Sequence, residues 1–291
     1  MSSPMSRSHV RVGPAEAGAP PSWLYVTDPA RAVAEFGLLI AMVPLKQLLP
    51  VGDGHPVLVL PGLLAGDNST WALRRILRDV GYRVHGWGLG RNLGPTATTV
   101  TGLQNRLLDL QSRYDSAVSV IGWSLGGIYA RTLARDTPAA VRQVIALGSP
   151  IRLADERQSR ARRAFNRYGH LHVVRRELPL ESDVDALPVP ATSIYSPYDG
   201  IVAWQACLDL PSPRAENIAV AASHLGFGHH PAVIWAVADR LAQPRGQWAP
   251  FRPPRALRPL YPRPDTPPER STRSGLGTRA VPISLLWRSV K

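Results

Sequence analysis

The sequence predicts an α/β fold with a mainly parallel sheet of about six strands and helices on both faces. Short, wholly apolar runs, such as Val57–Leu60, are typical of strands buried on both faces of a parallel sheet. Segments with apolar residues at helical spacing alternate with these runs, as at Leu73, Ile76, Leu77 and Val80. A length of 291 residues suits one larger domain of this class.

Six strands are expected along the chain, at residues 57–60, 82–87, 117–121, 141–147, 191–196 and 217–220. Helices are expected at residues 69–80, 100–114, 125–135 and 231–241. A helix over Ala30–Met42 is expected to precede the first strand, because Asp28 followed by Pro29 is typical of a helix start. Residues 151–188 are rich in arginine and interrupt the alternation, which predicts a lid-like insertion over the carboxyl edge of the sheet.

Composition divides the chain into three parts. Residues 1–22 and 243–291 are expected to be disordered, and residues 23–242 are expected to form the α/β domain. The formal net charge is +13, but residues 243–291 alone hold nine arginines, one lysine and ten prolines. Because most of the excess charge lies in this tail, the charge does not predict nucleic-acid binding, and no nucleic-acid partner is expected.

Cysteine content and hydropathy exclude other classes of protein. Cys207 is the single cysteine, so an intramolecular disulfide and a cysteine-based zinc site are excluded. Residues 1–22 lack the apolar run of a secretory signal, and the apolar stretch 36–43 is far shorter than the roughly 20 residues that span a bilayer. A cytoplasmic protein is expected. Peripheral contact with an anionic membrane, through the N-terminal helix or the arginine-rich insertion, stays open as an alternative.

The motif Gly122-Trp123-Ser124-Leu125-Gly126 fits G-x-S-x-G and lies between an expected strand and an expected helix. This context predicts a nucleophile elbow, a tight turn that holds the serine in a strained backbone conformation. Small residues at Gly122 and Gly126 would let the strand and the helix approach closely. The serine hydroxyl would then stand at the edge of the sheet, at the positive end of the helix.

A serine nucleophile needs a base, and the base needs an orienting acid. Asp199 follows the expected strand 191–196, and His224 follows the expected strand 217–220. The order Ser124, Asp199, His224 is the order expected for a nucleophile elbow in such a sheet. Rival residues exist for both roles, namely Asp183 and Asp185 in the insertion and His229 and His230 at the start of the last helix.

Attack on a carbonyl group also requires backbone donors for the developing oxyanion. The N–H of Leu125, directly after the serine, is one expected donor. The second is expected from the loop after the first strand, where Gly62 permits a turn and the Leu63 N–H is the candidate. No metal is expected, because His170 and His172 form a pair without a third ligand.

The segments VLVLPGLLAGDNST, VSVIGWSLGG, IYSPYDGIV and ASHLGFG resemble the α/β-hydrolase superfamily, and in particular its bacterial lipase- and esterase-like members. The resemblance covers roughly residues 50–242. It implies a serine hydrolase that cleaves carboxylic esters, either small esters or acyl lipids, through an acyl-enzyme and without a metal or cofactor. Pro61-Gly62 stands where many lipases carry His-Gly, which leaves the second oxyanion donor and the substrate open.

Two other functions are compatible with these residues. An acyltransferase would use the same triad and pass the acyl group to an alcohol instead of water. A catalytically silent hydrolase fold could serve as a scaffold, with the Arg/Pro-rich tail as its interaction segment. The intact triad favours an enzyme over the scaffold.

Overall fold

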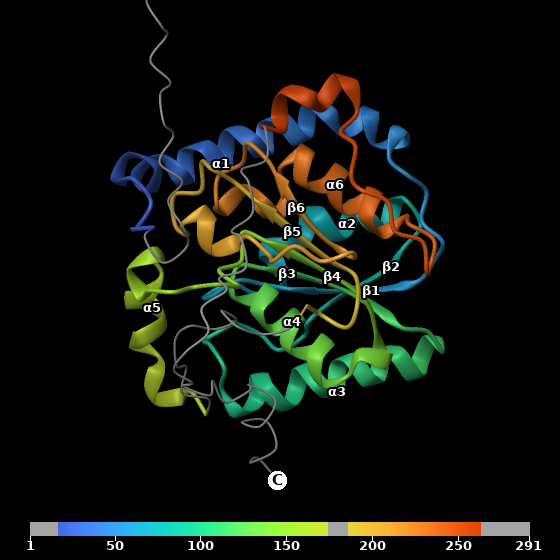
Figure 1. Cartoon of the computed structure of the whole chain (residues 1–291), viewed down its shortest axis with the longest axis horizontal. Coiled ribbons are helices and arrows are strands. Elements are labelled where there is room, and N and C mark those ends of the chain that lie inside the picture. Colours follow the sequence, from blue (N-terminus) through green and yellow to red (C-terminus); the bar gives the residue numbers. More distant parts are fainter. Residues whose placement is uncertain (1–16, 174–185, 263–291) are drawn as a thin grey trace, which may run out of the picture.

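The structure is a computed structural model that describes residues 17–173 and 186–262. In this part of the chain six strands form one parallel sheet in the order β2-β1-β3-β4-β5-β6 (Figure 1). The strands are β1 Pro56–Leu60, β2 Arg83–Gly86, β3 Val118–Trp123, β4 Val141–Leu147, β5 Ala191–Tyr195 and β6 Ala215–Ala219. The predicted α/β class, the number of strands and the parallel sheet are confirmed.

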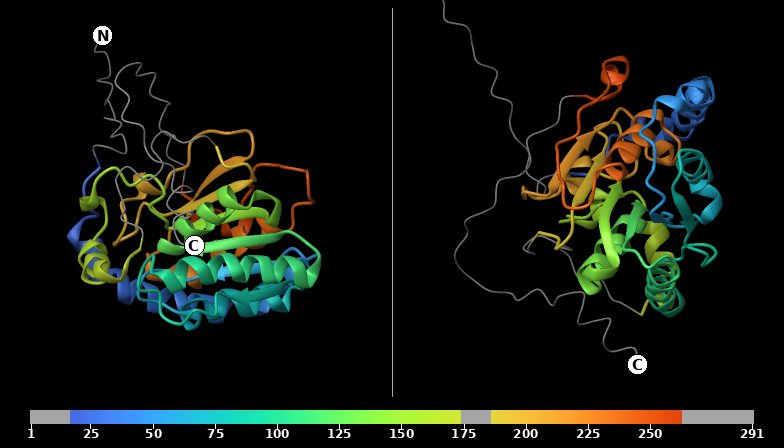
Figure 2. Two further views of the ribbon diagram at one scale, coloured as in Figure 1. Left: turned by 90° about the horizontal axis from the view of Figure 1, so that it is seen from below. Right: turned by 90° about the vertical axis from the view of Figure 1, so that its right-hand side faces the viewer.

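Helices cover both faces of the sheet. They are α1 Ser22–Met42, α2 Trp71–Asp79, α3 Ala97–Tyr114, α4 Leu125–Asp136, α5 Arg162–Arg167 and α6 Pro231–Leu241. Figures 1 and 2 show α1, α2 and α6 on one face and α3 and α4 on the other. Helices α2, α3 and α4 each connect two strands across one face of the sheet, as parallel pairing requires.

Two apolar layers hold the helices onto the sheet, and alternate residues of β1 supply one layer each. Val57 and Val59 join the cluster under α2 and α6, whereas Leu58 and Leu60 join the cluster under α3 and α4. All five residues of β1 are buried, which is why its sequence is continuously apolar.

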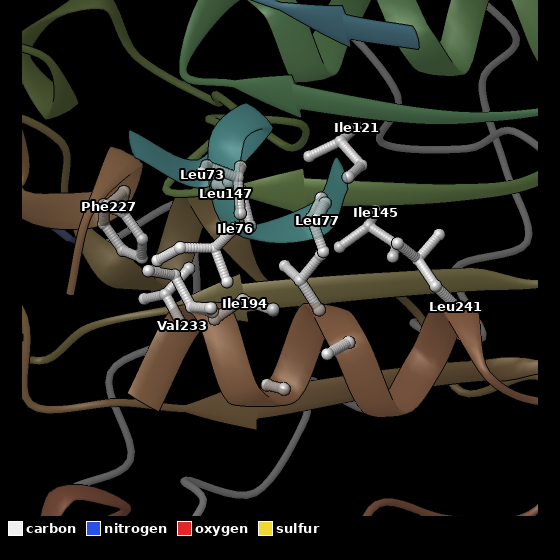
Figure 3. Packing of buried hydrophobic residues seen from close by; sticks show 14 of the residues in the cluster. Leu73, Ile76, Leu77, Ile121, Ile145, Leu147, Ile194, Phe227, Val233 and Leu241 are labelled. Carbon is white, nitrogen blue, oxygen red and sulfur yellow. The ribbon is translucent and has the colours of Figure 1, made fainter. Parts of the chain in front are cut away.

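The first of these layers is visible in Figure 3. Leu73, Ile76 and Leu77 of α2 lie on one side of their helix and meet Val233 of α6 and strand side chains such as those of β4 and β5. The predicted apolar stripe of this helix is therefore the stripe that packs on the sheet.

The first helix begins earlier than predicted. It starts at Ser22 instead of Ala30, and Pro29 lies inside it. Asp28 is not its N-cap; the Asp28 carboxylate accepts hydrogen bonds from backbone N–H groups of another part of the chain. Near Pro29, a side chain also bonds to the helix backbone: Thr27 Oγ1 donates to the Trp23 carbonyl one turn earlier (2.7 Å).

The predicted start of a disordered tail at residue 243 is wrong for residues 243–262, which the structure describes. Phe251, Leu260 and Tyr261 pack against the apolar cluster to which α6 contributes. The Phe251 N–H donates to the Glu216 carboxylate (2.8 Å), and the Tyr261 hydroxyl donates to the Ala232 carbonyl (2.7 Å). Composition alone missed these contacts because the aromatic anchors are few among many arginines and prolines. Residues 263–291 lie outside the described residues.

The predicted insertion falls between β4 and β5. Its described part, residues 151–173 and 186–188, contains α5 and is tied to the domain by backbone hydrogen bonds. The Arg160 N–H donates to the Ile201 carbonyl (2.9 Å), and the Val173 N–H donates to the Pro95 carbonyl (3.0 Å). Its role as a lid stays a prediction, and Asp183 and Asp185 lie outside the described residues.

Replacing Leu77 with alanine tests the packing of α2. Leu77 is fully buried, so we expect Leu77→Ala to lower the free energy of unfolding by about 2–5 kcal/mol. Val33→Ala on α1 is the control, because Val33 is 74% exposed and its replacement should change stability by less than about 0.5 kcal/mol. Urea unfolding followed by circular dichroism measures both. Equal losses of unfolding free energy in the two variants would contradict the packing of Leu77 against the sheet.

Candidate active site

Ser124 occupies the tight turn between β3 and α4. Its backbone has φ 53° and ψ −119°, in the left-handed half of the map that residues with a side chain rarely adopt. A Cβ atom at Gly126 would lie 2.5 Å from the Leu60 carbonyl oxygen, and one at Gly122 would collide with the Gly126 carbonyl. Small residues at both positions therefore allow α4 to begin directly above the strands.

The loop after β1 passes over Ser124. A Cβ atom at Gly62 would lie 3.2 Å from the Ser124 Cβ, so the backbone of this loop comes very close to the serine. Two hydrogen bonds from Asn92 hold this loop. The Asn92 side-chain amide donates to the Pro61 carbonyl (2.9 Å), and the Asn92 backbone carbonyl accepts from the Leu64 N–H (2.7 Å). Asn92 is fully buried.

Two backbone N–H groups near Ser124 are available as donors. Among the described residues, the Leu63 N–H donates to no protein acceptor, whereas the N–H groups of Leu64 and Ala65 donate to backbone carbonyls. Leu125 is the first residue of α4, and N–H groups in the first turn of a helix lack an intrahelical acceptor. The role of these two N–H groups as oxyanion donors stays a prediction.

Asp199 and His224 form a buried pair. The His224 Nδ1–H donates to Asp199 Oδ2 (2.7 Å), and both side chains are nearly inaccessible to solvent. The other carboxylate oxygen, Oδ1, accepts from the Ile201 and Val202 N–H groups, each at 2.7 Å. The two backbone hydrogen bonds thus fix the Asp199 carboxylate, and the carboxylate fixes the orientation of the imidazole. With its proton on Nδ1, the imidazole keeps a lone pair on Nε2.

The imidazole of His224 lies between two aromatic rings. Its centroid is 6.0 Å from that of Trp123 and 6.1 Å from that of Phe227. The Trp123 indole N–H also donates to the His224 carbonyl (3.1 Å). Since Trp123 immediately precedes Ser124, this hydrogen bond joins the serine turn to the histidine.

Ser124 and His224 are thus neighbours through Trp123, but the described residues contain no direct hydrogen bond between their side chains. Catalytic hydrogen bonds of this kind are often long before a substrate binds. Of the predicted site residues, the structure brings Asp199 and His224 into contact, and it places Ser124, Leu63 and Leu125 around one cavity.

Burial and the neighbouring carboxylates act in opposite directions on the pKa of His224. Burial of the imidazole disfavours its charged form, but attraction by Asp199, the hydrogen bond to it and a further attraction by Asp28 raise the pKa of His224 above 6.5. The neighbouring His230 behaves in the opposite way. Its burial and the nearby His229 lower its pKa to about 4.

A cavity of about 340 Å³ lies at Ser124, and helix α5 of the insertion forms part of its wall. Apolar side chains supply about half of the residues that line it, namely Leu63, Leu125, Ile128, Pro150, Leu153, Ala161 and Phe165. Polar residues also contribute, among them Glu156 and Arg162, which form an ion pair with each other (3.3 Å). The cavity can therefore take an apolar group next to the serine.

A second Ser-His-Asp row lies at the opposite ends of the strands. The His55 ring bonds to the Asp53 carboxylate through Nδ1, and its Nε2 is 2.8 Å from Ser119 Oγ. Ser119 is fully buried on β3 and lines neither the cavity at Ser124 nor the one beside Arg142 and Trp248. Burial lowers the pKa of His55, and Arg142 lowers it further, whereas the pKa of His224 is raised.

Sequence reasoning missed the residues that hold the site from outside its motifs. Asp28 and Glu35 of α1 bond to residues near His224, and Asn92 holds the loop over Ser124. The Ser196 hydroxyl joins the loops after β5 and β6 by donating to the Ala222 carbonyl (2.6 Å). None of these residues belongs to a recognisable pattern, because each acts across a long separation in the chain.

Two negative findings hold for residues 17–173 and 186–262. No three histidine, cysteine, aspartate or glutamate side chains gather as a set of metal ligands. No helix in this part of the protein combines the length and the apolar character needed to cross a membrane.

Comparison with known proteins identifies similar structures but no similar sequences. No family model matches the chain, and no curated protein matches it. Lipase B of Aspergillus fumigatus aligns with 65% of this chain at 16% identity and a TM-score of 0.52. The aligned region covers 53% of that lipase, so this chain spans about half of its length. At this identity the similarity shows the fold.

Two further solved structures cover a similar share of the chain. The pyrethroid hydrolase PytH aligns with 65% of this chain and 96% of its own, at 17% identity and a TM-score of 0.46. Est1E of Butyrivibrio proteoclasticus, solved with ferulic acid, aligns with 65% of this chain and 86% of its own, at 12% identity and a TM-score of 0.46.

The contact between Asp199 and His224 predicts the titration of two buried histidines. We expect the His224 imidazole to titrate above pH 6.5 and the His230 imidazole near pH 4. In Asp199→Asn the attraction is lost while burial remains, so His224 should titrate below 6.5 and His230 should not change. Imidazole chemical shifts measured by NMR across pH report both. A wild-type His224 that titrates at or below 6.5 would refute the electrostatic assignment.

Proposed function

We propose that this chain, which has the α/β-hydrolase fold, is a serine hydrolase that cleaves carboxylic esters through an acyl-enzyme. One observation carries the proposal: Ser124 stands in a strained turn at an apolar cavity, next to a buried Asp199–His224 pair. Strain at a nucleophile turn and an oriented acid–histidine pair are both features of serine catalysis.

In the first half of the proposed reaction, His224 Nε2 takes the proton of Ser124 while Ser124 Oγ attacks the ester carbonyl. The Leu63 and Leu125 N–H groups stabilise the negative charge that develops on the carbonyl oxygen. The tetrahedral intermediate collapses, the bond to the alcohol oxygen breaks, and the imidazolium of His224 protonates the leaving alcohol. The acyl group remains on Ser124.

In the second half, His224 takes a proton from water, and the hydroxide attacks the acyl carbon. Collapse of the second intermediate releases the carboxylic acid, and Ser124 recovers its proton from His224. Asp199 keeps its negative charge throughout, holds the Nδ1–H tautomer and stabilises the imidazolium. If added alcohols compete with water at this stage, the ester products would identify the alternative acyl transfer.

The proposed substrate is an ester with an apolar acyl or alcohol part. The leucine, isoleucine and phenylalanine side chains around Ser124 favour such a group by removing its surface from water. Among the cavity residues, Glu156 and Arg162 carry opposite charges and pair with each other (3.3 Å), so together they add no net charge to its wall.

A fluorophosphonate probe, which reacts with activated serines, tests the proposal. Wild type should be labelled, and Ser124→Ala should lose both labelling and at least about a thousandfold of its ester hydrolysis. Ser119→Ala is a matched control, because Ser119 also contacts a histidine but is fully buried on β3, and its labelling should equal that of wild type. Folded wild-type protein that is not labelled would contradict the proposal and favour the scaffold function.

We also propose that the outer side of α1 contacts an anionic lipid surface. Large apolar residues point into solvent there, among them Trp23 (62% exposed), Val33 (74%) and Ile40 (59%). The 3₁₀ turn Arg255–Leu260 lies at the same side of the molecule in Figures 1 and 2, and its exposed Arg255 and Arg258 would complement anionic headgroups.

Sedimentation with phosphatidylglycerol vesicles measures this contact. Ile40→Glu places a charge in the exposed apolar side of α1, and we expect at least roughly tenfold weaker vesicle binding. Leu108→Glu on α3 is the control, because Leu108 is also exposed but lies on the opposite face of the sheet. If the two variants bind vesicles as wild type does, α1 does not contact lipid.

A further inference from the structure

Asp28 of α1 joins the two loops that carry the proposed acid and base. We call residues 196–202 the acid loop and residues 221–226 the histidine loop. Asp28 Oδ2 accepts from the Gly200 N–H (3.0 Å) of the acid loop and from the His224 N–H (2.9 Å) of the histidine loop. Asp28 Oδ1 accepts from the Leu225 N–H (3.0 Å). One carboxylate thus receives backbone hydrogen bonds from both loops.

The surroundings of Asp28 are built for this contact. The residue is 1% exposed, and Arg31 one turn later pairs with its carboxylate (3.1 Å). Arg31 also donates to the Tyr198 carbonyl (2.8 Å), which adds a second bond from α1 to the acid loop. A Cβ atom at Gly200 would lie 2.8 Å from Asp28 Oδ2, so a glycine there lets the carboxylate reach the loop backbone.

Glu35 extends the same side of α1 by two turns. Its carboxylate accepts from the Ser223 N–H (2.7 Å) and from the Ser223 hydroxyl (2.6 Å). Asp28, Arg31 and Glu35 are spaced at i, i+3 and i+7, which places them on one side of the helix. This side faces the catalytic loops, whereas Trp23, Val33 and Ile40 are exposed.

We propose that Asp28 is a positioning residue of the active site, which fixes the acid loop and the histidine loop relative to each other and supplies a second negative charge beside His224. The inference rests on the proposed serine hydrolase function. In the described residues, Asp199 accepts from the imidazole itself and Asp28 accepts from the backbone N–H of His224. Arg31 pairs with Asp28, and Glu35 accepts from the adjacent Ser223. The attraction that Asp28 exerts on the imidazolium agrees with the raised pKa of His224.

Asp28→Asn tests the proposal, because the amide is isosteric but uncharged. We expect kcat for a p-nitrophenyl ester to fall roughly 10- to 100-fold with little change in KM, since the loops lose their common anchor. The acid limb of the pH profile of kcat/KM should move to lower pH, because loss of the Asp28 charge destabilises the imidazolium and lowers the pKa of His224. A merely structural role for Asp28 would not move this limb.

Glu35→Gln is the matched control. It also removes a carboxylate that α1 offers to the histidine loop, but Glu35 makes no contact with His224 itself. Its acid limb should therefore stay at the wild-type pH, whatever happens to its rate. If Asp28→Asn keeps the wild-type limb and the wild-type kcat, the proposal is overturned. The same holds if both variants shift the limb equally.

Asp28→Glu covers the case in which Asp28→Asn does not fold. The charge remains and the oxygens are displaced, so fluorophosphonate labelling should slow while the acid limb stays near its wild-type pH. Labelling at the wild-type rate would reject the positioning role. If wild type itself neither reacts with the probe nor cleaves the ester, the proposed function fails, and the role of Asp28 is judged by NMR: His224 must titrate at lower pH in Asp28→Asn than in wild type.

Discussion

The close approach of α4 to the strands is the constraint on which the candidate site depends. The helix begins directly after β3, and the Leu60 carbonyl lies where a side chain at Gly126 would have to stand. No relaxed turn fits in this space, so Ser124 takes a backbone conformation with φ 53°. The same crowding brings the loop after β1 over the serine, with Gly62 at contact distance from its Cβ. The strained turn at Ser124 and the close approach of the loop that carries Leu63 are therefore consequences of one packing contact.

Hydrogen bonds between the right residue types do not by themselves make a catalytic site. The row of Asp53, His55 and Ser119 has the same composition as the candidate triad and a direct bond from histidine to serine. Ser119 on β3 is fully buried, and burial together with Arg142 lowers the pKa of His55. The candidate site differs in three physical respects: strained backbone at the serine, a cavity beside it, and charges that favour an imidazolium.

Local patterns were sufficient to predict the sheet and the motif at Ser124, because strand burial and small residues at a tight turn are encoded within a few positions. Asp199 and His224 each follow a predicted strand, and the carboxyl ends of parallel strands meet at one edge of the sheet, where the two side chains are in contact. Asp28 was misread as a helix start, because its partners are Gly200 and His224, far along the chain. The segment up to residue 262 was missed because its contacts depend on Phe251 and Tyr261, whereas its composition is dominated by arginine and proline.

Two buried carboxylates, those of Asp28 in α1 and Asp199, lie on either side of His224 in the sense that one bonds to its backbone and the other to its ring. A buried charge is costly unless hydrogen bonds and an opposite charge compensate it. Asp28 accepts three backbone hydrogen bonds and pairs with Arg31, so its charge is compensated at the point where the acid loop and the histidine loop meet. Few apolar side chains of α1 are buried, namely Leu24, Ala32 and Leu39, so polar contacts contribute much of its attachment. The interactions that hold α1 to the domain are therefore largely the interactions that hold the acid loop and the histidine loop in place.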